Sequence, residues 1–356
     1  MIIKCVSDLF EINTNSMIVE LATHRDKQKT ENVIKSLKGQ ITALEILTNL
    51  SSDDAYEDAY ALESDEDIED DNSDGMDAEA EVDMSAELKP LIDQIVNNNL
   101  ISKILEMTRD IEADVRNKLL ENESGKQIYD LQEKLLIDSY LCLSNITEIM
   151  NIAQLGGGEN VKNIWLQLCS RLCSTTDNTD LADGLSCVVR SFTCHVCKAE
   201  AGVSLDNVGI DDLEMLVKVY SSYSSEEAAN IRTNIVNILG NFGCVATRNI
   251  SDQSCAVVIT KLATWILEIV VNDTCLRVAL EGLDKFIDVF GADETDKIFA
   301  EQKLTPKLKH ILSTIKARIS KEKKMMSAED VAVANTVKLN LQRFVNYKEK
   351  RVKNLM

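Results

Sequence analysis

The chain has 356 residues, of which 45% are hydrophobic and only 4% aromatic, with two prolines and a formal net charge of −21. This composition favours helices, excludes most sandwich and barrel folds, and gives enough length for one large core or two domains. No uninterrupted apolar run approaches the ~20 residues of a membrane span and the first residues lack a signal-peptide pattern, so we predict a soluble intracellular protein.

The charge is unevenly distributed along the chain. Between Lys38 and Lys89 there are eighteen Asp and Glu and no basic residue, and this window supplies all but −3 of the net charge. From Lys303 to Lys353, by contrast, fourteen Lys and Arg stand against four Asp and Glu. Because phosphate binding draws on positive charge, the acidic window favours a basic partner, and we expect no direct nucleic-acid ligand.

Helical periodicity begins near the N-terminus. In ITALEILTNL (41–50), apolar residues recur at the three- and four-residue spacing of a helix stripe. We assign residues 1–51 to an N-terminal helical repeat, the truncated part of an armadillo-type array. Residues 1–22 are not preceded by the polar capping repeat that normally ends such an array, so we expect the chain to be the C-terminal part of a longer one.

An acidic tract follows this first repeat. Residues 63–83 contain twelve carboxylates in twenty-one residues and no Lys or Arg. The tract has too few apolar residues to offset the entropy of ordering, so we predict a disordered insertion over residues 52–87, before a helix that begins near Leu88 or Leu91. It is either a passive solvated linker or an arm that binds a basic partner.

The remaining residues, 88–356, read as HEAT-like repeats. Similar amphipathic segments start at Tyr140, Leu185, Ile235 and Leu280, spaced by 45, 50 and 45 residues. HEAT and armadillo repeats have periods of roughly 40–47 residues, and each helix pair buries its apolar face only by stacking on its neighbours. The sequence therefore predicts an all-α solenoid of the HEAT/armadillo type.

Two local features of these repeats carry further predictions. Arg232 and Arg277 lie 45 residues apart, each just after the apolar residue that opens a long helix, and so occupy equivalent places. The glycines of LGGGEN (155–160) predict a sharp turn and not a phosphate-binding loop, because no GxxxxGK[ST] pattern follows.

The chemical motifs are weak. Cys194, His195 and Cys197 could contribute to a zinc site, but no second CxxC pair or HxxxH exists to complete four ligands. We expect core cysteines and a surface or capping histidine here, and we assign no metal site and no cofactor. With three histidines, no GxSxG and no nucleotide loop, the sequence indicates no catalytic residues and a protein that is not an enzyme.

The basic C-terminal stretch has two interpretations. KARISKEKK (316–324) and KEKRVK (348–353) resemble nuclear localisation signals. The same residues could instead form the solvated face of terminal helices.

Several motifs together resemble the symportin family, HEAT-repeat proteins that escort ribosomal proteins into the nucleus. The resemblance rests on ITALEILTNLSS followed by the acidic insertion, and on IRTNIVNILGNFG, LEGLDKFIDVF and VKLNLQRFVNYKE in that order. It implies a non-enzymatic chaperone and import adaptor of the cytoplasm and nucleus. The implied clients, meaning the proteins that it binds, are large-subunit ribosomal proteins five and eleven, which join 5S rRNA in a ribonucleoprotein.

The resemblance also implies where clients bind. In the family the acidic loop engages protein eleven, which here assigns Glu63, Asp65, Glu66, Asp67, Glu69, Asp70, Asp71 and Asp74. The solenoid groove takes a segment of protein five, for which we assign polar residues of second helices: Asn237, Asn241, Asp284 and Asp288.

The chain departs from the family pattern in one respect. Relatives carry an N-terminal Pro–Tyr signal for an import receptor, whereas the two prolines here, Pro90 and Pro306, precede Leu and Lys. We expect a monomer that holds a client without this signal. The alternative function is a general HEAT scaffold in which the acidic tract is only a linker.

Overall fold

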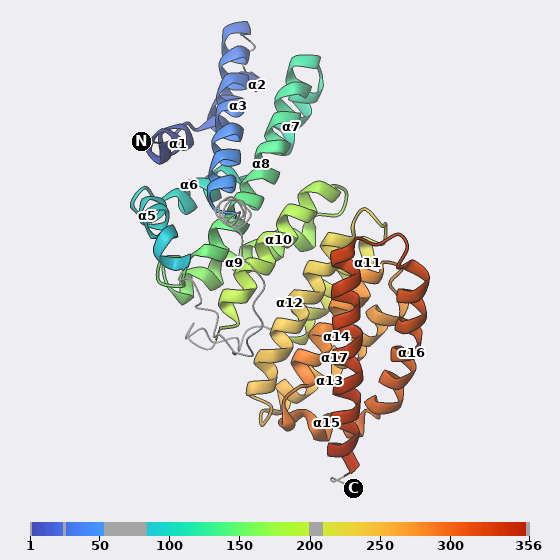
Figure 1. Ribbon diagram of the computed structural model, residues 1–356. Helices are drawn as coiled ribbons and strands as arrows, with labels where there is room; N and C mark the ends of the chain where they lie inside the picture. Colours follow the sequence, from blue (N-terminus) through green and yellow to red (C-terminus); the bar gives the residue numbers. More distant parts are fainter. Residues whose placement is uncertain (1, 24–25, 53–83, 199–208, 354–356) are drawn as a thin grey trace, which may run out of the picture. The chain divides into compact units, whose positions relative to one another are not determined.

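The computed structural model describes residues 2–23, 26–52, 84–198 and 209–353, and in these ranges the regular elements are all helices (Figure 1). The predicted acidic insertion therefore falls almost entirely outside the described residues. Two compact units are present, Met1–Val161 and Lys162–Met356. Residues before and after the acidic tract pack together in the first of these units.

The first unit is built around two long helices, α3 and α8, which run in the same direction and pack on each other. The α3 helix starts where the carboxylate of Asp26 accepts hydrogen bonds from the backbone N–H groups of Gln28 and Lys29, which have no partner within the helix. The helices of the first unit are α1 (Ile2–Phe10), α2 (Thr14–Thr23), α3 (Lys27–Leu50), α5 (Met84–Asn97), α6 (Leu100–Met107), α7 (Ala113–Leu120) and α8 (Glu123–Ile149).

One buried amide joins the short N-terminal helices to α3. The Gln40 side chain donates to the carbonyls of Leu9 and Ile12, at 3.1 and 2.8 Å, and bonds Thr14 at 3.1 Å. These bonds satisfy backbone groups in the turn between α1 and α2. On the far side of the tract, α5 begins at Met84, slightly earlier than the predicted start near Leu88.

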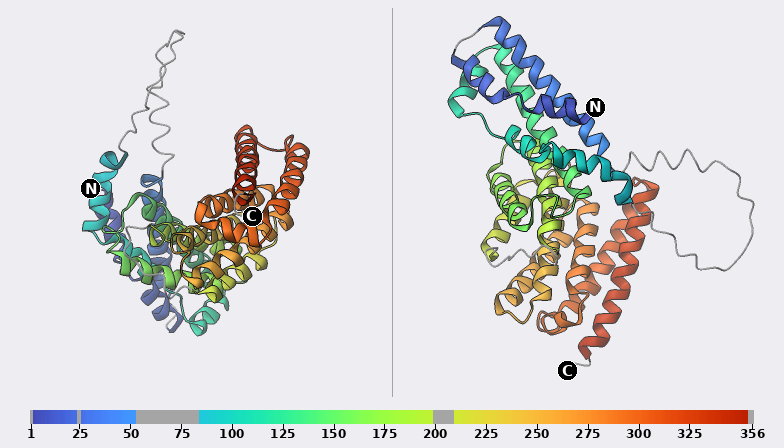
Figure 2. Two further views of the ribbon diagram at one scale, coloured as in Figure 1. Left: turned by 90° about the horizontal axis from the view of Figure 1, so that it is seen from below. Right: turned by 90° about the vertical axis from the view of Figure 1, so that its left-hand side faces the viewer.

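The second unit contains stacked helix pairs (Figures 1 and 2). The second helices form one layer, in which α12 packs on α10 and α14, and α14 packs on α17; α11, α13 and α16 pack on this layer. The elements are α9 (Gly158–Ser174), α10 (Thr179–Val196), α11 (Ile210–Ser222), α12 (Ala229–Arg248), α13 (Gln253–Asn272), α14 (Leu276–Phe290), η2 (Asp293–Thr295), α15 (Asp296–Glu301), α16 (Leu304–Glu322) and α17 (Ala328–Lys353).

The predicted repeat is confirmed in the second unit. Leu185, Ile235 and Leu280 are buried at corresponding places in α10, α12 and α14. The predicted turn is confirmed as well, since Gly156 and Gly157 both adopt φ of 90°, a conformation that favours glycine. The all-α solenoid predicted from the sequence is thus the observed fold class.

Among the described residues, one helix, α13, is long and apolar enough to cross a membrane by length and composition alone. Lys261 and Glu268 interrupt its apolar residues, yet its mean hydropathy stays high. It packs against α12 and α14 with Ile259, Leu262 and Ile266 fully buried. This is how a core helix of a solenoid packs.

Close approach of α12 and α14 depends on two glycines of α12. A Cβ at Gly240 would lie 2.7 Å from Lys285 Cβ, and one at Gly243 would lie 2.5 Å from Val289 Cγ2. Both distances are too short for real atoms, so only glycine lets the helices pack at this separation.

A buried charge network lies between the repeats. Arg232 and Asp273 are almost fully buried, and Arg232 Nε donates to Asp273 Oδ2 at 2.7 Å. Tyr220 donates to the same oxygen at 2.6 Å, and Arg318 donates to the Asp273 carbonyl at 3.0 Å. The equivalent Arg277, in contrast, is exposed. Equivalent places in the repeat therefore hold arginines with different environments.

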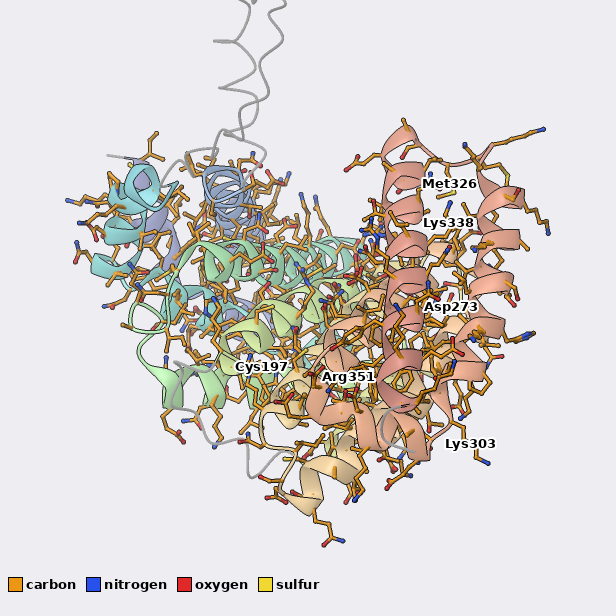
Figure 3. All side chains as sticks on the ribbon, turned by 60° about the horizontal axis from the view of Figure 1, so that its bottom comes forward. Cys197, Asp273, Lys303, Met326, Lys338 and Arg351 are labelled. Carbon is orange, nitrogen blue, oxygen red and sulfur yellow. The ribbon has the colours of Figure 1, made fainter. Side chains whose placement is uncertain are left out.

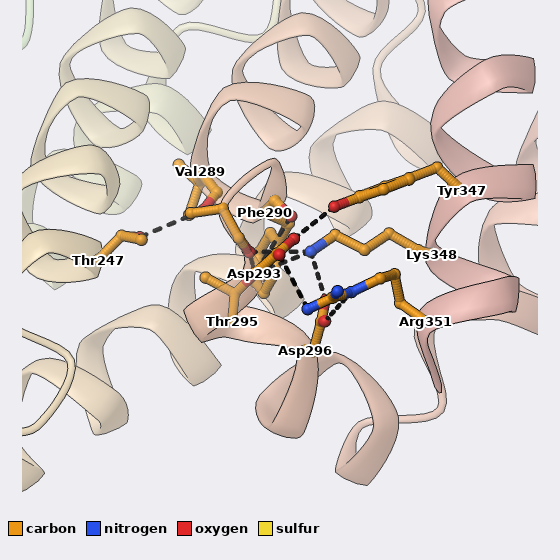
Figure 4. A network of polar contacts seen from close by, with 10 residues as sticks. Thr247, Val289, Phe290, Asp293, Thr295, Asp296, Tyr347, Lys348 and Arg351 are labelled. Atoms are coloured by element: carbon orange, nitrogen blue, oxygen red, sulfur yellow. Dashed lines mark hydrogen bonds and ion pairs between the residues drawn. The ribbon is translucent and has the colours of Figure 1, made fainter. Parts of the chain in front are cut away.

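A second network holds the last helix (Figure 4). Lys348 is fully buried and donates to Asp296 Oδ1 at 2.7 Å and to the Ala292 carbonyl at 2.9 Å. Arg351 bonds Asp296 Oδ2 at 2.8 Å and Asp293 at 2.9 Å. These residues were predicted as a localisation signal or a solvated face. The solvated-face prediction is wrong for Lys348, because its charge is neutralised inside the fold.

Candidate functional site

The predicted groove residues lie on two adjacent helices, α12 and α14, which pack on each other. On α12, asparagines recur at intervals of four, three and four residues, so they share one side of the helix. We call these four residues the asparagine row: Asn230, Asn234, Asn237 and Asn241.

The first member of the row connects three helices. Arg277 of α14 donates to Asn230 Oδ1 at 3.2 Å, and Asn230 also hydrogen-bonds Asp183 of α10. Burial raises the pKa of Asp183, and the hydrogen bond with Asn230 and the charge of Arg277 only partly oppose this. Asp183 Oδ1 is buried and makes no hydrogen bond with any described residue.

Other members of the row contact α10 through its cysteines. Asn234 Nδ2 donates to Ser186 Oγ at 2.9 Å and lies 3.3 Å from Cys187 Sγ. Asn241 Nδ2 lies 3.5 Å from the exposed Cys194 Sγ. Because sulfur is a weak acceptor, Asn241 keeps most of its capacity to bond another group.

Asn237 and the acidic residues of α14 complete this surface. Asn237 Nδ2 donates within its own helix to the Thr233 carbonyl at 3.2 Å, which leaves its side-chain oxygen available. On α14, burial and the charge of Asp288 raise the pKa of Asp284. Lys285 Nζ lies 3.0 Å from Asp288 Oδ2 and neutralises part of that charge.

The chemistry of this surface matches an extended peptide. Each amide carries both a donor and an acceptor, as does each peptide unit of a main chain, so a row of amides can bond a strand whatever its sequence. Carboxylates beside the row suit Lys or Arg side chains. No group of three or more His, Cys, Asp or Glu in the described part of the chain could hold a metal ion.

The sequence assigned some of these residues and missed others. Asn237 and Asn241 share the row, and Asp284 and Asp288 lie on the neighbouring α14. Asp183, Asn230 and Arg277 were missed, although the asparagine spacing was visible. Their contribution depends on contacts between helices, which no local pattern encodes.

Two further sets of predicted residues have other outcomes. The acidic-loop residues Glu63 to Asp74 lie outside the described residues. In the CxxC segment, Cys197 is buried, and burial raises its pKa to about 12. The expectation of a surface histidine is wrong, because His195 is only 3% exposed; it lies in the last turn of α10, and the capping alternative stays a prediction.

Comparison with known proteins gives consistent results. A family model described as "SYO1-like, TPR repeats" matches residues 89–352. HEAT repeat-containing protein 3 of Homo sapiens is 26% identical over 356 residues, which are 97% of this chain and 50% of that protein. The Mus musculus protein of the same name is 25% identical over 359 residues, or 95% of this chain and 50% of that protein. The chain thus spans about half the length of the curated relatives that it matches.

Both descriptions denote arrays of helical repeats, which agrees with the stacked helix pairs of the second unit. Such arrays work through extended surfaces that bind partner proteins. SYO1 is the yeast symportin, and the match covers most of the residues: the chain belongs to the symportin family.

Proposed function

We propose that this protein is a non-enzymatic chaperone and nuclear import adaptor for basic ribosomal proteins of the large subunit, among them proteins five and eleven of the 5S ribonucleoprotein. It acts in the cytoplasm and the nucleus. The observation that carries the proposal is the asparagine row with carboxylates on both neighbouring helices. Membership of the symportin family supports it.

In this proposal an extended client segment lies along the asparagine row. Asn237 and Asn241 bond its main chain, and Asp183, Asp284 and Asp288 attract its basic side chains. Burial raises the pKa values of Asp183 and Asp284, and a nearby cationic client side chain would lower them again. Client binding should therefore strengthen the preference of these groups for the charged form.

The acidic tract is proposed as the second client-binding element. Its carboxylates (Glu63, Asp65, Glu66, Asp67, Glu69, Asp70, Asp71 and Asp74) can occupy the rRNA-binding face of a basic client, where they compete with phosphate. Because the tract is tethered to the repeats, its effective concentration near a client held there is high. Release would follow when folded rRNA offers denser charge.

The test measures the affinity of the whole chain for purified ribosomal proteins five and eleven. Replacing Asn237 and Asn241 with Ala should weaken binding of protein five, the client assigned to the groove, by about tenfold or more, since each lost hydrogen bond contributes about 1 kcal/mol. The matched control replaces Asn117 and Asn346, which are exposed and lie outside the row. Equal affinities of the two double variants would contradict the proposed use of the row.

Deleting residues 53–85 tests the tract separately. The adaptor should lose protein eleven and keep its thermal stability. A general HEAT scaffold with a passive linker would keep both clients. Retention of both after the deletion would therefore favour the scaffold function.

A further inference from the structure

The inference concerns α16 and the turn after it, a part of the second unit that the proposed function does not use. Six lysines there are exposed and form no ion pair with any described residue. We call them the α16 lysines: Lys303, Lys307, Lys316, Lys321, Lys323 and Lys324. Figure 3 shows Lys303 at one end of α16 and Met326 at the other end, where the turn leads into α17.

Three acidic residues in this region are already engaged with other cations, and Glu329 and Asp330, in the first turn of α17, form no ion pair with the α16 lysines. Glu349 of α17 pairs with Lys309 at 2.8 Å and with Lys353 at 3.4 Å. Glu322 lies 3.5 Å from Arg318. Asp296 is occupied by the second buried network. The α16 lysines therefore keep their positive charge unneutralised at the surface.

The exposed side of α16 offers little to a protein partner. Between the lysines it presents His310, Ser313, Thr314 and Ser320. The large apolar side chain that is well exposed in this stretch is Met325, in the turn. Protein interfaces are anchored by buried aromatic and apolar residues, whereas phosphate contacts use Lys, Ser and Thr. The side chains of this surface are those that contact phosphate.

The same lysines are poor candidates for a linear localisation signal. Such a signal is read as an extended peptide, but residues 316–322 belong to α16 and Ile319 within them is buried. Binding in extended form would require the last turns of α16 to unfold. The lysines are instead displayed on a folded surface, with fixed spacing.

We propose that the exposed side of α16 and its following turn bind the phosphate backbone of RNA. By helical periodicity Lys307 and Lys321 lie on the same flank of α16 and about 21 Å apart along the axis, so they can contact separate phosphates of one strand or duplex. The choice of RNA over DNA rests on the proposed function. The proposed contact with phosphate rests only on the exposed lysines of α16.

This inference differs from the expectation drawn from net charge. That expectation rested on the acidic window between Lys38 and Lys89. Screening limits the reach of a charge to about 10 Å at 0.1 M salt, so a phosphate in contact with α16 responds mainly to the lysines beside it.

The experiment measures binding of the whole chain to a fluorescent RNA hairpin without any client, over 50–300 mM salt. The test variant replaces Lys307, Lys321, Lys323 and Lys324 with Gln. The control replaces four exposed lysines elsewhere with Gln, which gives the same net charge: Lys4, Lys35, Lys89 and Lys218. Thermal unfolding of each variant checks that the fold is kept.

We expect the test variant to bind RNA about 30-fold or more weakly at 100 mM salt, and its slope of log affinity against log salt to fall by about 3, since each phosphate contact contributes about 0.7–0.9. The control should differ from the wild type by less than about threefold, because its lysines belong to other helices and the α16 lysines are kept.

Three results would overturn the inference: no RNA binding by the wild type, equal losses in both variants, or tighter binding of a DNA hairpin or a poly-glutamate peptide than of RNA. Because no ribosomal protein is present, failure here leaves the client-binding proposal untouched.

Discussion

Asp273 shows how a buried carboxylate becomes part of a repeat interface. Burial alone would raise its pKa, but hydrogen bonds from Arg232, Tyr220 and the backbone N–H of Cys275 outweigh this and hold the pKa below its usual value. The buried charges of Arg232 and Asp273 compensate each other, so removing either side chain leaves the other as an uncompensated buried charge.

Replacing Asp273 with Ala should therefore lower the free energy of unfolding by about 3–5 kcal/mol, because Arg232 stays buried without its carboxylate. Urea denaturation would measure the loss. The matched control is Asp288→Ala, which breaks a more exposed pair with Lys285 and should cost less than about 1 kcal/mol. Similar losses in the two variants would mean that the buried pair contributes no more than a surface pair.

Acid should destabilise the protein through the same network. The folded pKa values of Asp273 and Asp296 are depressed, so their contribution to stability is present above the unfolded pKa of about 3.9 and is lost as pH falls through the lower folded values. We expect the free energy of unfolding to fall steeply below about pH 4. The double variant Arg232→Met/Asp273→Leu should show a shallower fall in the same titration; an unchanged profile would exclude Asp273 as a source.

At the scale of elements, the sequence predicted the helices well because their apolar periodicity is strong and their period is regular. It could not predict how repeats differ. Arg232 and Arg277 occupy equivalent places in the repeat. Arg232 nevertheless hydrogen-bonds Asp273 in the turn before α14, whereas Arg277 hydrogen-bonds Asn230 on α12. The hydrogen-bond partner of each arginine comes from a neighbouring repeat, which a local sequence pattern does not show. For the same reason the sequence did not identify Asp183 and Asn230 as site residues.

Helix separation offers a direct test at this scale. Gly243→Ala should lower the free energy of unfolding by about 1–3 kcal/mol, because the new Cβ would overlap Val289 on α14. Gly39→Ala in α3 is the control. Its Cβ would meet Leu9 at an ordinary 3.4 Å, and alanine favours a helix by about 1 kcal/mol over glycine. Calorimetry should show opposite shifts in unfolding temperature; stabilisation by both would refute the packing argument.

At the scale of the whole molecule, charge is separated along the chain. The acidic window and the basic C-terminal stretch give the proposed functions different ligands: basic proteins for one, phosphate for the other. The composition revealed this separation at once. It did not reveal that part of the basic stretch, including Lys348 and Arg351, forms ion pairs with acidic residues of the same unit.

Client binding should consequently depend strongly on salt. We expect the affinity for ribosomal protein eleven to fall at least tenfold between 50 and 300 mM salt, since both partners release counterions or are screened. Converting the Asp and Glu of residues 63–83 to Asn and Gln should flatten this dependence. Titration calorimetry would measure both; an affinity that is independent of salt, or that survives the conversion, would contradict the arm mechanism.

The network around Lys348 has a consequence for local opening. In repeat proteins each unit contacts only its neighbours, so terminal helices usually fray first. Here Lys348 and Arg351 join α17 to residues more than fifty positions earlier in the chain. Backbone amides in the last turns of α17 should therefore exchange with deuterium as slowly as those of α14, which makes these turns some of the most slowly opening parts of the second unit.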